Sequence, residues 1–517
     1  MNIPVIKPGE IPPDHVAPDS LKGVPRQQTK PSRWMAKDWD EFAKAVSDHG
    51  ISIKEDRASC SIYSSDSGGM AYGMPHGVIV ARSNGQVAAV MKEAQRYHIP
   101  VKVRGGSLTT EGETVAFGGL QLDMTGMSNV LEVDHENMTV RTETGIYWHT
   151  LAEVLRRDGY DYLSAPLNMT SSVGGTLSVG GIDINSPRLG CSADQAVALK
   201  VVTPQGEIIE CSDTVNPEVF NRNLLGYGQF GIITEATLRI KKFTPITMHY
   251  FYYSSLSSAI KDMMMLARHD ASDYIGILTI MDRVVNLLVA FDSVEREQAF
   301  FTKWRRRIKG YGESGFGIKM AVHYAMRPWR IKEALYLLDR KKSLMPEFNP
   351  SHHMSGESIV DRTVVFSKAV WKFWGGRQMV IPDLATKEEK FIEAVERGNA
   401  VCKKYFPHYT LYCVGIKLLG NKERYEMSCI PPDAEGIAYG CEFEPMLEDR
   451  YYSHDYLQSF KNEIYDIGVD MKTSYYRFGG MMKGYIRRVF GDEVVDKHLA
   501  LKKEADPAMI LNSDVIF

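Results

Sequence analysis

The first half of the chain alternates between apolar patterns of period two and of period 3.6. Short runs of apolar or alternating residues predict strands, at residues 78–80, 99–103, 119–123, 197–202, 207–209 and 232–240, with two more within 130–144. Apolar residues that recur on one helix face predict two helices, at 87–94 and 151–155. Glycine turns separate these elements. An α+β unit is therefore expected up to about residue 242.

The segments on either side of this unit differ from it in composition. Residues 1–36 are rich in proline and predict an extended N-terminal arm. From about residue 245, two apolar runs predict a hairpin, and long amphipathic segments with many aromatic residues follow. We therefore expect a first domain at 37–244 and a second at 245–470. The final segment, 471–517, contains a helix end and a short strand that return to a core.

The charge balance argues against two classes of partner. The 517 residues include 61 Lys and Arg against 64 Asp and Glu, a formal net charge of -3. Binding to nucleic acid or to an anionic membrane needs clustered basic side chains. The one dense basic run, at residues 303–309, is interpreted as a solvated helix face. We expect neither partner, whereas a homodimer is compatible with the sequence.

Cysteine usage and the N-terminus predict the compartment. The seven cysteines show no CxxC spacing, which predicts reduced thiols. The first residues show no signal pattern, and no apolar stretch reaches the roughly 18 residues that span a bilayer. We therefore expect a cytoplasmic protein. No metal site is expected, because His352 and His353 lack a third ligand and no HExxH motif occurs.

Three glycine-rich stretches are candidates for phosphate binding. Residues 226–231 match the dinucleotide fingerprint GxGxxG, but a strand pattern follows them at 232–240. That fingerprint requires a helix at this point, since the helix N-terminus meets the pyrophosphate. Residues 104–110 fit an anion-binding loop better, because a strand end leads into two glycines and three hydroxyl residues. Residues 171–181, with two Gly-Gly pairs, form a second such loop.

The order of these motifs resembles the vanillyl-alcohol oxidase and para-cresol methylhydroxylase type of FAD flavoenzyme, with cytokinin dehydrogenases nearest. The resemblance rests on residues 101–107, 174–178 with 188–190, 226–240, and Asp506-Pro507 with 510–512. It implies an α+β fold with a bipartite FAD-binding domain, made of residues 37–244 and 471–517. An α/β cap domain at 245–470 would then cover the isoalloxazine ring.

The resemblance also implies which residues contact the FAD. They fall into the two glycine stretches, the start of the strand at 232–240 and the C-terminal segment. They are Val103, Arg104, Gly105, Gly106, Ser107, Leu108, Thr109, Ser172, Gly174, Gly175, Thr176, Ser178, Gly180, Gly181, Gly231, Ile232, Ile233 and Asn512. Asp66, ahead of the first strand, is a further pocket candidate.

Two departures from the relatives change the expected chemistry. Gly106 occupies the position of the histidine that cytokinin dehydrogenases link to the flavin, and residues 168–172 contain no cysteine. We therefore predict noncovalent FAD. The carboxylate that accepts the substrate proton in those enzymes is also missing, since residues 165–167 are Ala-Pro-Leu. The cytokinin substrate is accordingly not carried over.

A second comparison suggests another catalytic group. Phenol-oxidising members carry a Tyr-Arg pair some thirty residues before the final Asp-Pro, and Tyr476-Arg477 stands at about that place. An Arg beside a Tyr hydroxyl stabilises a phenolate. The resemblance thus implies an oxidase or dehydrogenase that moves hydride to flavin N5 from a C–H next to O or N of a small organic substrate, for which an aromatic ring is expected. The electron acceptor is O2 or another carrier. The alternative is a non-redox FAD-binding cyclase or isomerase.

Overall fold

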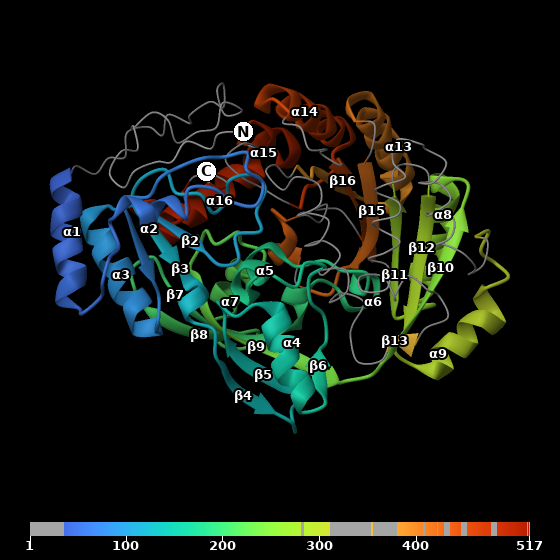
Figure 1. The fold of residues 1–517 in the computed structure, drawn as a ribbon, viewed down its shortest axis with the longest axis horizontal. Coiled ribbons are helices and arrows are strands. Elements are labelled where there is room, and N and C mark those ends of the chain that lie inside the picture. The colour runs from blue at the N-terminus through green and yellow to red at the C-terminus, as the bar shows by residue number, and fades with distance from the viewer. Residues whose placement is uncertain are drawn as a thin grey trace, which may run out of the picture.

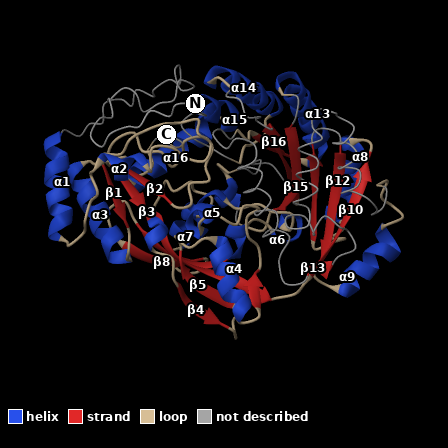
Figure 2. Ribbon diagram, viewed as in Figure 1, coloured by secondary structure: helices blue, strands red, loops and turns tan. Residues whose placement is uncertain are grey.

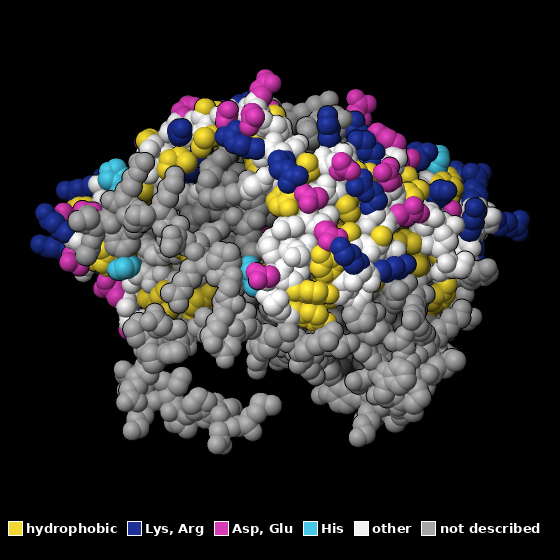
Figure 3. Space-filling view, turned by 90° about the horizontal axis from the view of Figure 1, so that it is seen from above, with side chains coloured by type: hydrophobic (Ala, Val, Ile, Leu, Met, Phe, Trp, Pro, Cys, Tyr) yellow, Lys and Arg dark blue, Asp and Glu magenta, His cyan; other side chains and the backbone are white. Residues whose placement is uncertain are grey.

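The computed structural model describes residues 36–280, 284–310, 353–354, 380–406, 409–420, 422–428, 435–445, 452–476, 483–513 and 515. The fold is α+β and contains three sheets (Figure 1). In the described part no helix is long and apolar enough to cross a bilayer. No cluster of three or more His, Cys, Asp or Glu side chains suited to a metal is found there either. Acidic and basic side chains are interspersed on the face shown in Figure 3.

The first sheet is parallel and small. Its strands are β1 (Gly77–Val80), β2 (Val101–Arg104) and β3 (Leu120–Asp123), in the order β1-β3-β2. Helix α3 (Asn84–Tyr97) connects β1 to β2, and α1 (Ala36–Asp48) packs on α3, while α2 (Arg57–Ser61) precedes β1. The apolar face of α3 that the periodicity predicts is fully buried. Arg104 and Asp123 therefore lie together where β2 and β3 end.

The second sheet is antiparallel and carries the remaining strands of the first half. Its order is β4 (Val130–Asp134), β5 (Thr139–Glu143), β9 (Ile232–Lys242), β7 (Ala196–Val202) and β8 (Ile208–Ser212), with β6 (Tyr160–Tyr162) paired to β9. The helices in this stretch of the chain are α4 (Trp148–Arg157), α5 (Val173–Val179), α6 (Ser186–Leu189) and α7 (Pro217–Asn223), with 3-10 turns η2 (Met124–Gly126) and η3 (Ser192–Gln195). Because β9 directly follows Gly231, residues 226–231 do not lead into a helix.

The third sheet begins after residues 243–245, where the chain leaves the second sheet. Its order is β13 (His353–Met354), β10 (Ile246–Tyr253), β12 (Val284–Phe291), β11 (Tyr274–Ile280), β15 (Tyr409–Lys417), β16 (Ile437–Pro445) and β14 (Asp383–Thr386). Helices α8 (Leu256–Arg268), α13 (Glu388–Tyr405) and α14 (His454–Met471) pack on one face through a large apolar core (Figure 2). The shorter helical pieces are α9 (Val294–Ala299), the π-turn η4 (Phe300–Trp304) and η7 (Lys422–Tyr425).

The C-terminal segment reaches the first sheet. Helices α15 (Lys483–Phe490) and α16 (Asp492–Ala505) lead to Leu511, which forms a parallel bridge with Val101. The expected short strand is thus reduced to a single bridge. The buried ammonium of Lys502 donates to Asp506 and to the carbonyl oxygens of Gln229 and Leu511, each at 2.7 Å. This network fixes the tail against the rest of the domain.

The prediction of a loop at residues 171–181 is wrong over most of its length, because residues 173–179 form α5. The hydroxyl of Ser172 caps this helix by accepting the N–H of Gly175 at 3.3 Å. Val173, Thr176 and Leu177 share one helix face and are buried. A capping serine and this apolar stripe therefore outweigh the low helix propensity of the two glycines.

Candidate cofactor and substrate site

The loop after β2 presents a row of backbone N–H groups without acceptors. The N–H groups of residues 105–110 make no hydrogen bond to any residue that the structure describes. On either side of them, the Val103 N–H donates to Asn512 Oδ1 at 3.0 Å and the Gly112 N–H to Asp66 Oδ2 at 2.9 Å. Most buried backbone N–H groups in proteins are paired, and consecutive free ones form anion-binding concavities. This loop can therefore bind an anion through its backbone.

The segment before β1 holds the loop in this shape. The N–H and hydroxyl of Ser67 donate to the Ser107 carbonyl at 3.2 and 2.8 Å, and the Gly68 N–H donates to the Thr109 carbonyl at 3.1 Å. In a planar trans peptide the N–H points opposite to the preceding carbonyl. The N–H groups of Leu108 and Thr110 consequently point away from residues 67–68.

The two glycines of the loop allow it to pack against the start of α5. A Cβ on Gly105 would lie 2.0 Å from Ser172 Oγ, and one on Gly106 would lie 2.7 Å from the Thr170 carbonyl oxygen. No side chain fits at either position. The loop and the N-terminal end of α5 are thus brought together, as the sequence analysis expects for a single cofactor.

The start of α5 contributes an accessible backbone surface rather than free donors. The Gly174 N–H donates to the Thr144 carbonyl at 2.8 Å, and the N–H groups of Gly175 and Thr176 bond to Ser172. Gly174 is nevertheless partly exposed and Gly175 is exposed. A planar ring can approach the backbone closely here, since no side chain intervenes.

The remaining predicted cofactor residues of this stretch are engaged by the protein. Thr176 Oγ1 accepts the indole N–H of Trp148 at 2.9 Å, and Ser178 Oγ donates to the Gly174 carbonyl at 2.8 Å. Gly180 and Gly181 have φ values of 123° and 75° and end the helix. These residues therefore stabilise α5 and its C-terminal end.

The strand β9 and the tail also position the loop. Ile232 and Ile233 are buried and pair with Val202 and Val201 of β7, and a Cβ on Gly231 would lie 2.5 Å from Val201. Asn512 uses both ends of its amide, because Nδ2 donates to the Gly228 carbonyl at 2.8 Å. The predicted contact of these residues with the cofactor remains a prediction.

At the ends of β2 and β3, the predicted cofactor residue Arg104 meets side chains that the sequence did not single out, among them Tyr63, Asp123 and Tyr147. The Arg104 guanidinium donates to the carbonyl oxygens of Tyr63 and Ser65 at 3.3 and 2.9 Å, so its hydrogen bonds go to the segment before β1. Tyr63 Oη donates to Asp123 Oδ2 at 2.7 Å. Tyr147 lies beside Gly106, and burial raises the pKa of its hydroxyl. Asp123 could have been found from the sequence, since it ends a predicted parallel strand, where ligands of α/β sheets bind.

A group of three carboxyls lies on the other side of the loop. Asp66 accepts the Thr109 hydroxyl at 2.8 Å and the Gly68 N–H at 3.0 Å, while Glu113 accepts the Glu111 N–H at 2.8 Å. Burial, with the charge of Glu111 nearby, raises the pKa of Asp66 to about 6. Burial and the charges of Asp66 and Glu111 raise the pKa of Glu113 to about 8. Of these three carboxyls, only Asp66 is a pocket candidate from the sequence.

Helix α14 is joined to this group by a buried ion pair. The ammonium of Lys461 contacts Glu111, and both side chains are 0% exposed. Tyr465 Oη donates to the other Glu111 oxygen at 3.2 Å. Residues about 350 positions apart thus fix the cofactor loop to the C-terminal helices.

The predicted catalytic pair is only partly described. The hydroxyl of Tyr476 accepts the Gly181 N–H at 3.1 Å, and its backbone N–H donates to Asp383. Tyr476 therefore lies beyond the C-terminal end of α5, whereas the accessible Gly174 and Gly175 are at its start. Arg477 lies outside the described residues.

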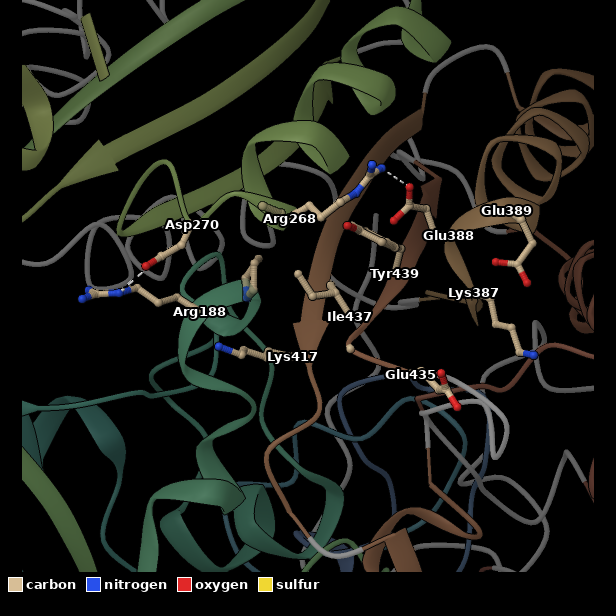
Figure 4. Close-up of a pocket in the computed structure, with 13 residues that line it drawn as sticks. Arg188, Arg268, Asp270, Lys387, Glu388, Glu389, Lys417, Glu435, Ile437 and Tyr439 are labelled. Atoms are coloured by element: carbon tan, nitrogen blue, oxygen red, sulfur yellow. Dashed lines mark hydrogen bonds and ion pairs between the residues drawn. The ribbon is translucent and has the colours of Figure 1, made fainter. Parts of the chain in front are cut away.

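A cavity of about 630 Å³ lies elsewhere, between α6, α8, the start of α13 and the ends of β15 and β16 (Figure 4). Charged side chains of both signs line it. Arg268 pairs with Glu388, and Arg188 with Asp270 at 3.6 Å. Tyr439 faces it from the helix-covered side of the third sheet. None of the predicted cofactor residues lines this cavity.

Comparison with known proteins agrees with the geometry. A family model described as an FAD binding domain matches residues 75–212. An uncharacterized oxidoreductase, ORF5 in the fasciation locus of Rhodococcoides fascians, is 31% identical over 213 residues, 41% of this chain and 48% of that protein. D-lactate dehydrogenase from Anaerostipes hadrus is 31% identical over 172 residues, 32% of this chain and 36% of that one. Cytokinin dehydrogenase 2 from Arabidopsis thaliana is 28% identical over 232 residues, 44% and 46% of the two chains.

These curated relatives are matched over about half of their length or less. The fold is matched more completely. A solved alkyldihydroxyacetonephosphate synthase superposes with a TM-score of 0.63 at 14% identity, covering 92% of this chain and 84% of that one. The shared FAD-binding domain and the bipartite fold confirm the resemblance drawn from the motifs, and the cofactor is FAD. Over residues 75–212 the chain is thus similar to FAD-binding flavoproteins, among them cytokinin dehydrogenases.

Proposed function

We propose that this chain is an FAD-dependent oxidase or dehydrogenase of a small organic substrate. The observation that carries the proposal is the set of N–H groups at residues 105–110 that have no acceptor among the described residues, beside the accessible backbone of Gly174 and Gly175. The first can hold a pyrophosphate, and the second can lie against a flat ring. Relatives named as oxidoreductase, D-lactate dehydrogenase and cytokinin dehydrogenase support a redox role.

The proposed reaction is a two-electron oxidation next to oxygen or nitrogen. Bound FAD supplies the hydride acceptor, at flavin N5. The substrate C–H bond breaks and its electron pair leaves with the hydrogen, while the O–H or N–H proton passes to a base or to solvent. The product is the corresponding C=O or C=N compound. O2 or another carrier would be the final acceptor of the two electrons.

The protein groups proposed for this step are Tyr476 and Arg477. Tyr476 is held beside Gly181, and Arg477 follows it directly in the sequence. A cation at this point would stabilise a bound phenolate, which releases hydride more readily than a phenol does. We further propose that FAD is held noncovalently, because the loop has Gly106 where a linking histidine would stand.

The test is an anaerobic absorbance titration of the purified holoprotein with phenols, amines, polyols and hydroxy acids. We expect at least one class of compound to bleach the oxidised-flavin absorbance band, which lies near 450 nm. A flavin spectrum that no compound bleaches would favour the non-redox alternative. Acid precipitation of the same sample should leave the flavin in the supernatant, whereas flavin in the pellet would show a covalent link.

A further inference from the structure

Polar side chains form a line across one face of the third sheet. The strand register pairs Asn286 with Leu278, Leu278 with Tyr412, Tyr412 with Glu442, and Glu442 with Asp383. Directly paired residues of antiparallel strands point to the same face. We call Asn286, Tyr412, Glu442 and Asp383 the polar row.

The polar row faces the FAD-binding domain. Tyr412 and Leu278 belong to an apolar cluster that also contains Leu167, Ile182 and Ile184. Glu442 is directly paired with Tyr412, and Asp183 stands between Ile182 and Ile184 of that cluster. Burial, together with the negative charges of these two carboxylates, raises the pKa of Tyr412 well above its usual value. Helices α8 and α13 cover the opposite face.

One end of the row reaches the proposed catalytic residue. Asp383 accepts the backbone N–H of Tyr476, and the Tyr476 hydroxyl in turn meets Gly181 at the end of α5. Leu167, which occupies the region of the missing base, bonds through its N–H to the Ile182 carbonyl at 3.1 Å, next to Asp183. The polar row is therefore continuous with the proposed reaction site.

Two buried groups of the row have no partner among the described residues. Tyr412 is 6% exposed and Asn286 is 1% exposed, yet Tyr412 Oη and Asn286 Oδ1 accept or donate no hydrogen bond there. Asn286 Nδ2 donates to the Leu278 carbonyl at 3.2 Å, which leaves its oxygen as an acceptor. Buried polar groups are normally satisfied, so both atoms call for a ligand that supplies hydrogen bonds.

We propose that the polar row binds the polar end of the substrate, and that this end is a neutral or cationic group with O–H or N–H donors, such as an alcohol, phenol or amine. The inference rests on the proposed function. An amide oxygen and a hydroxyl accept such donors, and the neighbouring Asp183 and Glu442 carboxylates add negative charge. A carboxylate substrate would meet like charges in a buried place, where repulsion is weakly screened. Hydroxy acids are thus excluded by this subsite.

The experiment compares three compounds that share one ring: 4-hydroxybenzyl alcohol, 4-hydroxybenzylamine and 4-hydroxymandelate, with D-lactate as a non-aromatic acid. Each is titrated anaerobically into wild type, Tyr412→Phe, Asn286→Leu and Tyr439→Phe, with FAD content and melting temperature measured for every variant. Tyr439→Phe is the matched control. It removes an equally buried hydroxyl that also lacks a hydrogen-bond partner among the described residues, but from the opposite face of the sheet.

The neutral or cationic compound should bleach the wild-type flavin at concentrations at least tenfold below those of 4-hydroxymandelate. Loss of one buried hydrogen bond should raise the apparent Kd about tenfold in Tyr412→Phe and in Asn286→Leu, with FAD content unchanged. Tyr439→Phe should behave as wild type. Tyr412→Phe keeps the ring volume, so its apparent Kd tests the proposal by itself if Asn286→Leu does not fold.

The possible outcomes test the proposed subsite and the proposed reaction separately. Preferred bleaching by 4-hydroxymandelate or D-lactate would overturn the subsite while leaving the oxidoreductase intact. Equal effects of Tyr412→Phe and Tyr439→Phe would also overturn it. A flavin that none of the compounds bleaches or shifts would reject the proposed function, and the inference with it.

Discussion

Lys461 offers the sharpest test of how the cofactor loop is held. Its ammonium and the Glu111 carboxylate are both fully buried, and Tyr465 is the other group bonded to that carboxylate in the described structure. Lys461→Met keeps the length of the side chain and removes the charge. Glu111 is then left as an uncompensated buried anion near Asp66 and Glu113. Breaking a buried pair in this way costs about 3–5 kcal/mol.

The destabilisation by Lys461→Met should therefore be about 3–5 kcal/mol. Lys461→Met combined with Glu111→Gln should recover most of this loss, because no buried charge is then left without a partner.

The matched control is an exposed ion pair that joins α13 to α14, the helix that carries Lys461. Lys404 pairs with Glu463 at 2.6 Å, but the two side chains are 62% and 37% exposed. Lys404→Met should cost less than about 1 kcal/mol. Urea unfolding is followed by circular dichroism and by flavin fluorescence, which reports release of FAD. Equal shifts for the two single variants, or a double variant as unstable as Lys461→Met alone, would refute the account of a buried, uncompensated charge.

Two further predictions concern the same loop. Gly106→Ala should weaken FAD binding at least tenfold, because its Cβ would lie 2.7 Å from the Thr170 carbonyl oxygen; Gly484→Ala, where nothing lies within 4 Å, is the control, and equal FAD retention would contradict the packing argument. The raised pKa values of Asp66 and Glu113 mean that the folded state binds extra protons. Their contribution to stability is complete below the unfolded pKa values near 4, declines as the pH rises, and is gone above about pH 8. Glu113→Gln should make the melting temperature fall less between about pH 4 and pH 8. An unchanged dependence of melting temperature on pH would show that Glu113 does not cause this fall.

Local patterns along the chain were sufficient for most strands and for two helices of the first half, and the motifs carried the resemblance that implied the FAD-binding fold, whereas α1, α7 and β6 were not predicted. Strand alternation after Gly231 excluded a dinucleotide helix, and β9 confirms this because its residues pair with β7 on one side and β5 on the other. The same local reasoning failed at residues 171–181. Two Gly-Gly pairs favour a loop when taken alone, whereas the Ser172 cap and the burial of Val173 and Leu177 favour a helix. The burial depends on neighbours that the local sequence does not specify.

The sequence by itself determined the order of the elements, the glycines that let the cofactor loop pack closely, and the resemblance that implied FAD. Each of these depends on residues close together in the chain. Only the tertiary structure decided which N–H groups stay unpaired, that Lys461 neutralises Glu111, and that Asn286 and Tyr412 share one row. Sheet register and helix packing bring these distant residues together. The free energy of a buried charge or amide depends on its neighbours in space, which a linear pattern does not contain.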